Sequence, residues 1–138
     1  ADLERLVRER FARYAVIEEK EPMSENYMVD DADYVVVAYG ASARVAKAAV
    51  REAREQGIKA GLIRPITLWP FPKQAMRDAA KHAKAFLCVE MSMGQMIDDV
   101  KLAIDCSRPV EFFGRTGGII PTPAEVLENI KKLAGGEK

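Results

Sequence analysis

Short apolar runs alternate with helical patterns along the chain from residue 34 onward. Runs with the length of strands occupy residues 34–39, 60–63, 85–90 and 110–113. The first run, YVVVAY, is apolar at almost every position, which is typical of a strand covered on both faces of a parallel sheet. Between the runs, apolar residues recur at helical spacing, so we expect a helix after each strand.

Local signals predict where these helices begin and end. Ser42 can N-cap the helix after the first run, and Gly57 can close it. Pro72 can be the first residue of the second helix, because proline fits the first helical turn. Residues 122–125, TPAE, combine a capping box with proline at the first helical position and start the last helix.

This alternation predicts an α/β fold. We expect a doubly wound, mainly parallel sheet of about four or five strands with helices on both faces, joined by right-handed crossovers. The simplest order of the apolar runs in the sheet, numbered along the chain, is 2-1-3-4.

An N-terminal helical arm precedes this domain. Asp2 is a good N-cap, and Leu3, Val7, Phe11 and Tyr14 then lie on one apolar stripe of an amphipathic helix.

The segment after this arm, residues 18–33, reads as an acidic connector that wraps the domain or leads in from a preceding one. Residues 1–33 hold ten of the 21 acidic and five of the 21 basic residues, a net charge of −5, which leaves +5 for residues 34–138. We therefore divide the chain into a helix and linker from a missing preceding domain, residues 1–33, and one domain, residues 34–138.

The composition narrows the class of protein. At 138 residues and 15.3 kDa, the chain has room for one ordinary domain. Its formal net charge of zero gives no argument for nucleic acid or an anionic membrane as a partner, and no apolar run approaches the roughly 20 residues of a membrane helix. The opening ADLERLVRER has no signal-peptide core and no initiator Met, so we expect a piece of something longer. The two cysteines, Cys88 and Cys106, lie far apart, and we expect a reducing, cytoplasmic setting.

In doubly wound sheets, ligands bind beyond the carboxyl ends of the strands, at the switch point between the first strand and its neighbour. This rule selects the loops at residues 40–42 and 90–94, with residues 114–115 beside them. In the first loop, Gly40 and Ser42 could bind an anion with Arg44 nearby. One glycine and one hydroxyl fall short of a phosphate-loop fingerprint, which favours the alternative of a tight turn with a cap.

Glu90 is the most interesting ionisable residue, because it ends a buried strand and precedes a Met-rich loop with Gly94 and Gln95. It could face a ligand or a partner chain, with the methionines as adaptable apolar contacts. Alternatively, the methionines fill core gaps and Glu90 holds the loop by hydrogen bonds. The stretch that begins with Gly114 and Arg115 looks like a phosphate loop, but it runs into IIPTP, which favours a rigid connector.

We expect no catalytic residue and no metal site in this chain. Gly40 and Ser42 resemble the start of a nucleophile elbow, but Arg44 replaces its second glycine, and the only histidine, His82, belongs to a helix end far from the strand ends. Cys88 reads as a small buried hydrophobe. The two cysteines form no CxxC, which excludes zinc-ribbon and iron–sulfur ligation.

Four ordered stretches carry a family resemblance: DDADYVVVAYGASARVAKAAV, LIRPITLWPFP, CVEMSMGQ and GRTGGIIPTPAEVLENI. Together they resemble the C-terminal domain of the alpha subunit of 2-oxoacid:ferredoxin oxidoreductases, which is similar to the transketolase C-terminal domain. The resemblance covers about residues 30–133. The GRTGGIIPTP ending resembles the 2-oxoglutarate or branched-chain types more than the pyruvate type.

The resemblance implies an enzyme that oxidatively decarboxylates a 2-oxoacid to an acyl-CoA, with thiamine diphosphate, Mg²⁺ and iron–sulfur clusters that pass electrons to ferredoxin. This chain has no GDG motif and no cysteine set, so those cofactors would belong to other domains or subunits, and the chain alone would not be catalytic. The expected partners are those domains and subunits in an oligomer, with ferredoxin and coenzyme A bound through the complex. The loops at Gly40, Glu90 and Gly114 would shape the interface or border the substrate or coenzyme A channel.

A different class of protein is the alternative: a stand-alone flavodoxin-like module that binds a small anionic ligand in the same crevice. A third interpretation, a purely structural assembly domain, differs from the first only in whether a loop contacts ligand.

Overall fold

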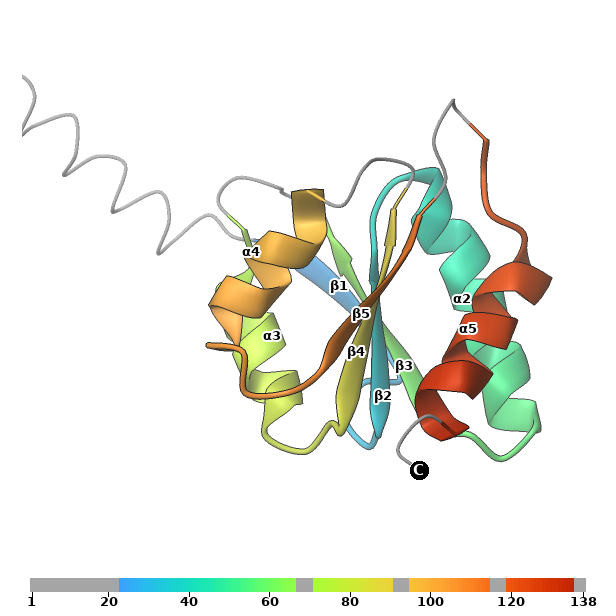
Figure 1. Ribbon diagram of the computed structural model, residues 1–138, viewed down its shortest axis with the longest axis horizontal. Coiled ribbons are helices and arrows are strands. Elements are labelled where there is room, and N and C mark those ends of the chain that lie inside the picture. The colour runs from blue at the N-terminus through green and yellow to red at the C-terminus, as the bar shows by residue number, and fades with distance from the viewer. Residues whose placement is uncertain (1–22, 67–70, 91–94, 115–118, 136–138) are drawn as a thin grey trace, which may run out of the picture.

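The computed structural model describes residues 23–66, 71–90, 95–114 and 119–135 (Figure 1). The expected N-terminal helix, with its stripe from Leu3 to Tyr14, lies outside these residues. The division of the chain at residue 33 stays a prediction.

Strands and helices alternate along the described residues. The strands are β1 (Ser24–Tyr27), β2 (Tyr34–Ala38), β3 (Ala60–Pro65), β4 (Ala85–Glu90) and β5 (Val110–Gly114). The helices are α2 (Ala41–Glu55), α3 (Lys73–Ala80), α4 (Gln95–Ala103) and α5 (Pro123–Gly135). All four apolar runs are therefore strands, and a helix follows each of them.

The strands form one five-stranded sheet in the order β1-β3-β2-β4-β5. Pairing is parallel from β3 through β2 and β4 to β5, and β1 is antiparallel to β3. The predicted doubly wound, mainly parallel α/β fold and the order of the four apolar runs are confirmed. β1 falls in the segment interpreted as a connector, and its side chains are all at least partly exposed, so no apolar pattern marked it.

Helices cover both faces of the sheet (Figure 1). On one face, α2 and α5 pack on side chains such as Val36 and Leu87, with Ile130 of α5 buried among them. On the other face, α3 and α4 pack on a second cluster that includes Phe86 and Val100. All five residues of β2 are buried, as expected for a central strand of a parallel sheet.

The start of α2 differs from the prediction. Gly40, not Ser42, is the N-cap, and no side chain caps this end of the helix. Gly40 has φ +62° and ψ −140°, a conformation that favours glycine. The chain turns at Gly40 and enters the helix at once, which places Ser42 inside the first turn, where its side chain is buried.

The other helix ends follow the sequence signals more closely. Gly57, with φ +84°, ends α2 in a Schellman motif. Pro72 is the N-cap of α3 and not its first helical residue, a shift of one position. The capping box of α5 is confirmed, because the Glu125 N–H donates to Thr122 Oγ1 at 3.2 Å and the Thr122 N–H donates to Glu125 Oε1 at 3.2 Å.

Arg54 anchors the segment between β1 and β2 to the end of α2 through hydrogen bonds. Its guanidinium donates to both carboxylate oxygens of Asp31, at 2.7 and 3.0 Å, and to the backbone oxygens of Met28 and Ala60, each at 2.7 Å. Val29 in the same segment is buried. Residues 23–33 are thus packed onto the sheet and its core.

Candidate functional site at the switch point

The carboxyl ends of β2 and β4 form the switch point of the sheet. Ala38 pairs with Val89, so the two strands end side by side. The helix after β2 packs on one face of the sheet and the helix after β4 packs on the other (Figure 1). The two connections diverge here, which is the arrangement at which doubly wound sheets bind ligands.

The first turn of α2 lies at this edge and contains no acidic residue. Gly40 is exposed, and a Cβ added there would meet nothing within 4 Å, so its backbone conformation alone calls for glycine. Ser42 is 1% exposed, whereas Arg44 is exposed. The three residues considered for an anion site therefore lie in different surroundings: Gly40 at the edge, Ser42 in the interior and Arg44 on the outer face of α2.

Glu90 is the last residue of β4 and is 1% exposed. Its Oε1 accepts a hydrogen bond from the backbone N–H of Met96, at 2.8 Å. Met96 lies in the first turn of α4 and is itself buried in the core. Glu90 thus holds the start of α4 against the end of β4, and Met96 fills the core. Met91 and Met93, the other methionines of the Met-rich stretch, lie outside the described residues.

Gly114 lies beside Glu90, since the two are paired residues of β5 and β4. A Cβ at Gly114 would come within 2.3 Å of the Phe112 ring, so the ring lies over this glycine. Gln95 is the first residue of α4. Gly94 and Arg115 lie outside the described residues. The structure therefore brings Glu90 and Gly114 together at one edge, at which Gly40 also follows β2.

Cys88 and His82, which the sequence analysis set aside as catalytic candidates, lie away from the exposed part of the switch-point edge. Cys88 is fully buried, and desolvation, with a smaller contribution from the Glu90 carboxylate, raises the pKa of its thiol. His82 lies just after α3, at the amino ends of the strands, with its Nδ1 at 3.0 Å from the backbone oxygen of Ala32. Residues 23–66, 71–90, 95–114 and 119–135 hold no group of three or more His, Cys, Asp or Glu side chains suited to a metal ion.

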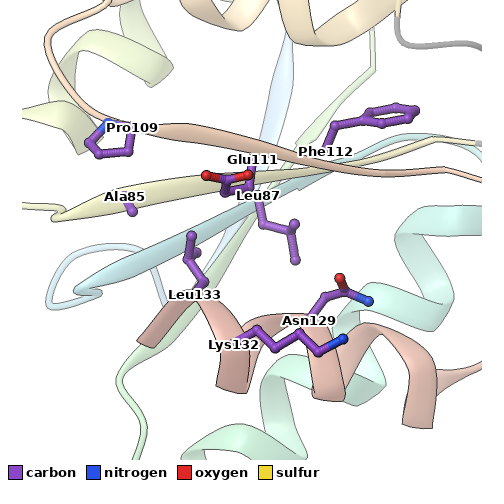
Figure 2. Close-up of a pocket in the computed structure, with 8 residues that line it drawn as sticks. All are labelled: Ala85, Leu87, Pro109, Glu111, Phe112, Asn129, Lys132 and Leu133. Atoms are coloured by element: carbon purple, nitrogen blue, oxygen red, sulfur yellow. The ribbon is translucent and has the colours of Figure 1, made fainter. Parts of the chain in front are cut away.

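A pocket of about 520 Å³ lies between the edge strand β5 and α5 (Figure 2). Leu87 and Leu133 supply apolar walls, and Glu111, Asn129 and Lys132 supply polar ones. Sequence reasoning missed this pocket, which forms because α5 packs mainly over β2, β4 and α2. One signal in the sequence could have indicated this pocket: Glu111 is a charged residue in a predicted strand. Its side chain lies on the same face of the sheet as that of its paired residue, Leu87.

A second pocket, of about 130 Å³, lies between α2 and the paired strands β1 and β3. Arg44 and Lys47 line it from α2, and Glu25 and Arg64 from the strands. Sequence reasoning named Arg44 but missed the others, because the pairing of β1 with β3 brings them together.

The fold and this edge define a class: a doubly wound α/β domain whose switch point carries an ordered, buried carboxylate. The described residues bring no nucleophile–histidine pair to that edge. The chain belongs to the family of the pyruvate:ferredoxin oxidoreductase core domain II, whose sequence pattern matches residues 32–126. It is a domain of the kind found in 2-oxoacid:ferredoxin oxidoreductase subunits, as the resemblance implied.

Curated relatives agree with this family. The ketoisovalerate oxidoreductase subunit VorB of Methanothermobacter marburgensis is 50% identical over 123 residues, which cover 89% of this chain and 35% of VorB. The 2-oxoglutarate synthase subunit KorA of the same organism is 42% identical over 101 residues, which cover 73% of this chain and 27% of KorA. The chain therefore spans about a third of the length of these relatives.

Solved structures share the fold. A 2-oxoglutarate:ferredoxin oxidoreductase from Magnetococcus marinus matches 96% of this chain and 23% of its own, with a TM-score of 0.77 and 20% identity. A split-gene transketolase matches 84% of this chain and 42% of its own, with a TM-score of 0.70 and 17% identity. The transketolase-like architecture is confirmed, and none of these comparisons supports a stand-alone flavodoxin-like module. Within the described residues, no helix is both long enough and apolar enough to cross a membrane.

Proposed function

We propose that this chain acts as the C-terminal domain of the alpha subunit in an oxidoreductase that converts a 2-oxoacid to an acyl-CoA, with ferredoxin as electron acceptor. The observation that carries the proposal is the 50% identity to a ketoisovalerate oxidoreductase subunit over 89% of the chain. Within the family, we favour a branched-chain 2-oxoacid or 2-oxoglutarate as substrate. The GRTGGIIPTP ending and the names of the two curated relatives described above support that preference.

The proposed contribution of this domain is to shape one wall of the substrate or coenzyme A channel. The wall would be the switch-point edge, with Gly40 after β2, Glu90 at the end of β4, and Gly94 and Arg115 further along the sequence. Ser42, which is 1% exposed, would support this edge from inside the first turn of α2. Glu90 would act as a positioning residue, because its carboxylate fixes the start of α4 next to that edge. The Magnetococcus marinus enzyme was solved with 2-oxoglutarate, coenzyme A and succinyl-CoA bound, which supports a channel for these ligands in the assembled enzyme.

Mg²⁺ and iron–sulfur clusters do not fit the described residues, and the sequence has no GDG motif for thiamine diphosphate and its Mg²⁺. These residues offer no converging set of metal ligands, and the whole chain has two cysteines, fewer than the four that an iron–sulfur cluster commonly needs. We therefore assign the cofactors to other domains or subunits. The purified chain alone should give no cluster absorption band and no viologen reduction with a 2-oxoacid.

The test uses the complete oxidoreductase that contains this chain. Glu90→Gln and Arg115→Ala should each lower turnover of the 2-oxoacid with a viologen dye, or raise the KM for coenzyme A, with assembly unchanged. Glu111→Gln is the matched control, since it makes the same chemical change on the exposed edge strand β5. Full activity and unchanged coenzyme A affinity in both Glu90→Gln and Arg115→Ala would overturn the proposed role of this edge.

A further inference from the structure

The pocket between α2 and the paired strands β1 and β3 concentrates positive charge. Strand pairing puts Glu25 beside Arg64 and Tyr27 beside Leu62, and all four of these side chains line the pocket. Ala43, Arg44 and Lys47 line it from the first two turns of α2. The pocket has a volume of about 130 Å³, so it has room for a small group, and its lining combines the apolar Ala43 and Leu62 with charged side chains.

The cations of this pocket outnumber its acids. Arg44, Lys47 and Arg64 line it together with one carboxylate, that of Glu25, which leaves a net charge of +2. Residues 41–51 of α2 contain no acidic residue that could offset this charge.

Two of the three pocket cations, Arg64 and Lys47, have partners on β1. Arg64 donates to Glu25 at 3.1 Å. The Lys47 ammonium lies 4.9 Å from the centroid of the Tyr27 ring, and Arg51 donates to the Tyr27 hydroxyl at 3.4 Å. Arg44 makes no ion pair or side-chain hydrogen bond with any residue that the structure describes. Three cations around one pocket, one of them with no such partner among the described residues, favour the binding of an anion.

We propose that this pocket binds the phosphate group of a small ligand. A phosphate monoester carries a charge of about −1.5 to −2 at pH 7, which matches the net charge of the pocket. Two guanidinium groups can each donate in pairs to phosphate oxygens, and Lys47 adds a point charge. The proposal goes beyond the channel wall assigned above, since β1, β3 and the outer face of α2 line this pocket, and the switch point lies between β2 and β4.

The source of the phosphate is either free inorganic phosphate or a phosphate carried by a nucleotide. Titrations of the full 138-residue chain, followed by two-dimensional ¹H–¹⁵N NMR at constant ionic strength, separate the two. One arm uses orthophosphate and the other adenosine 3′,5′-bisphosphate. Saturable shifts at residues 25–27, 43–47 and 62–64 are expected in at least one arm. If orthophosphate and the bisphosphate bind with equal affinity, the ligand of the pocket is free phosphate. If the bisphosphate binds more tightly, the ligand is a nucleotide.

Variants connect these shifts to the pocket. Arg44→Gln combined with Lys47→Gln should weaken binding by about tenfold or more. Lys131→Gln combined with Lys132→Gln is the matched control, since it removes the same charge from α5 and should stay within about twofold of the wild-type affinity. Glu25→Gln should tighten binding by about threefold, because it removes the one carboxylate of the pocket and releases Arg64.

Three results would overturn the proposal: no saturable shift in either arm, an equal loss of affinity in the α5 control, or unchanged affinity in Glu25→Gln. A loss of fold cannot imitate a positive result, because the spectra report the fold of each variant directly. The outcome is independent of the oxidoreductase assay, so failure here would leave the proposed function untouched.

Discussion

The buried carboxylate of Glu90 accepts a hydrogen bond from the backbone N–H of Met96 at 2.8 Å, across the loop that joins β4 to α4. The first N–H groups of a helix have no partner within the helix, so a carboxylate at this position satisfies one of them. A negative charge is also favourable at the positive end of a helix. One side chain thus ties the end of the strand to the start of the next helix at the edge where ligands are expected.

Removing this carboxylate should destabilise the domain. We expect Glu90→Ala to lower the free energy of unfolding by about 2–4 kcal/mol, because it breaks a buried, charge-assisted hydrogen bond and leaves a cavity. Glu90→Gln keeps an acceptor oxygen of similar shape and should lose only about 1–2 kcal/mol. Urea denaturation of the full chain measures both losses. Equal losses in the two variants would show that the hydrogen bond to Met96 contributes little.

The contact between Arg54 and Asp31 should make the free energy of unfolding depend on pH in the acidic range. The hydrogen bond from Arg54 is the main cause that holds the pKa of Asp31 below its usual value of 3.8. Because the pKa is lowered in the folded state, the contribution is complete above pH 3.8 and is lost as the pH falls through the folded-state pKa. The wild-type protein should therefore exceed Asp31→Asn in stability near neutral pH.

Urea denaturation of both proteins from about pH 2 to about pH 7 tests this dependence. The difference between their unfolding free energies should stay constant from neutral pH down to about pH 5 and then shrink toward zero in stronger acid. A difference that persists at the lowest pH would contradict the assignment.

The sequence predicted the parallel sheet well, because strands buried on both faces, such as β2 and β4, must be apolar at nearly every position. It did not predict β1, since this edge strand has polar side chains and depends on backbone pairing with β3 and on the anchor from Arg54 to Asp31. Neither of those contacts leaves a local pattern in the sequence.

The candidate site stays a prediction, and only part of its surroundings could be read from the sequence. The switch-point rule needs only strand order and the sides from which helices leave, so Glu90 could be selected from the sequence. The predicted N-cap at Ser42 was wrong, because the N-cap of α2 is Gly40, two residues earlier. A difference of this size is usual at helix boundaries. The cationic pocket required the pairing of β1 with β3, which places Arg64 beside Glu25 although 39 residues separate them.

The two cysteines should react differently with a thiol reagent. Cys88 is fully buried, and desolvation raises the pKa of its thiol, so almost no thiolate forms at neutral pH. Cys106 is exposed. We expect one thiol per chain to react with Ellman's reagent under native conditions and two in urea. If Cys106→Ser shows no reaction under native conditions, the reactive thiol is that of Cys106. Rapid reaction of two thiols per native chain would contradict the burial of Cys88.

Gly61 should not tolerate a side chain. A Cβ added there would lie 2.6 Å from the backbone oxygen of Met28 and 3.0 Å from the Ala32 Cβ. That backbone oxygen already accepts from Arg54, so the strand and the loop cannot separate without loss of this contact. Gly61→Ala should therefore lower the free energy of unfolding by about 1–3 kcal/mol in urea denaturation. Gly135→Ala is the control, because its Cβ would meet nothing within 4 Å, and it should stay within about 0.5 kcal/mol of the wild type. Equal stability of the two variants would mean that the loop yields to the extra methyl group.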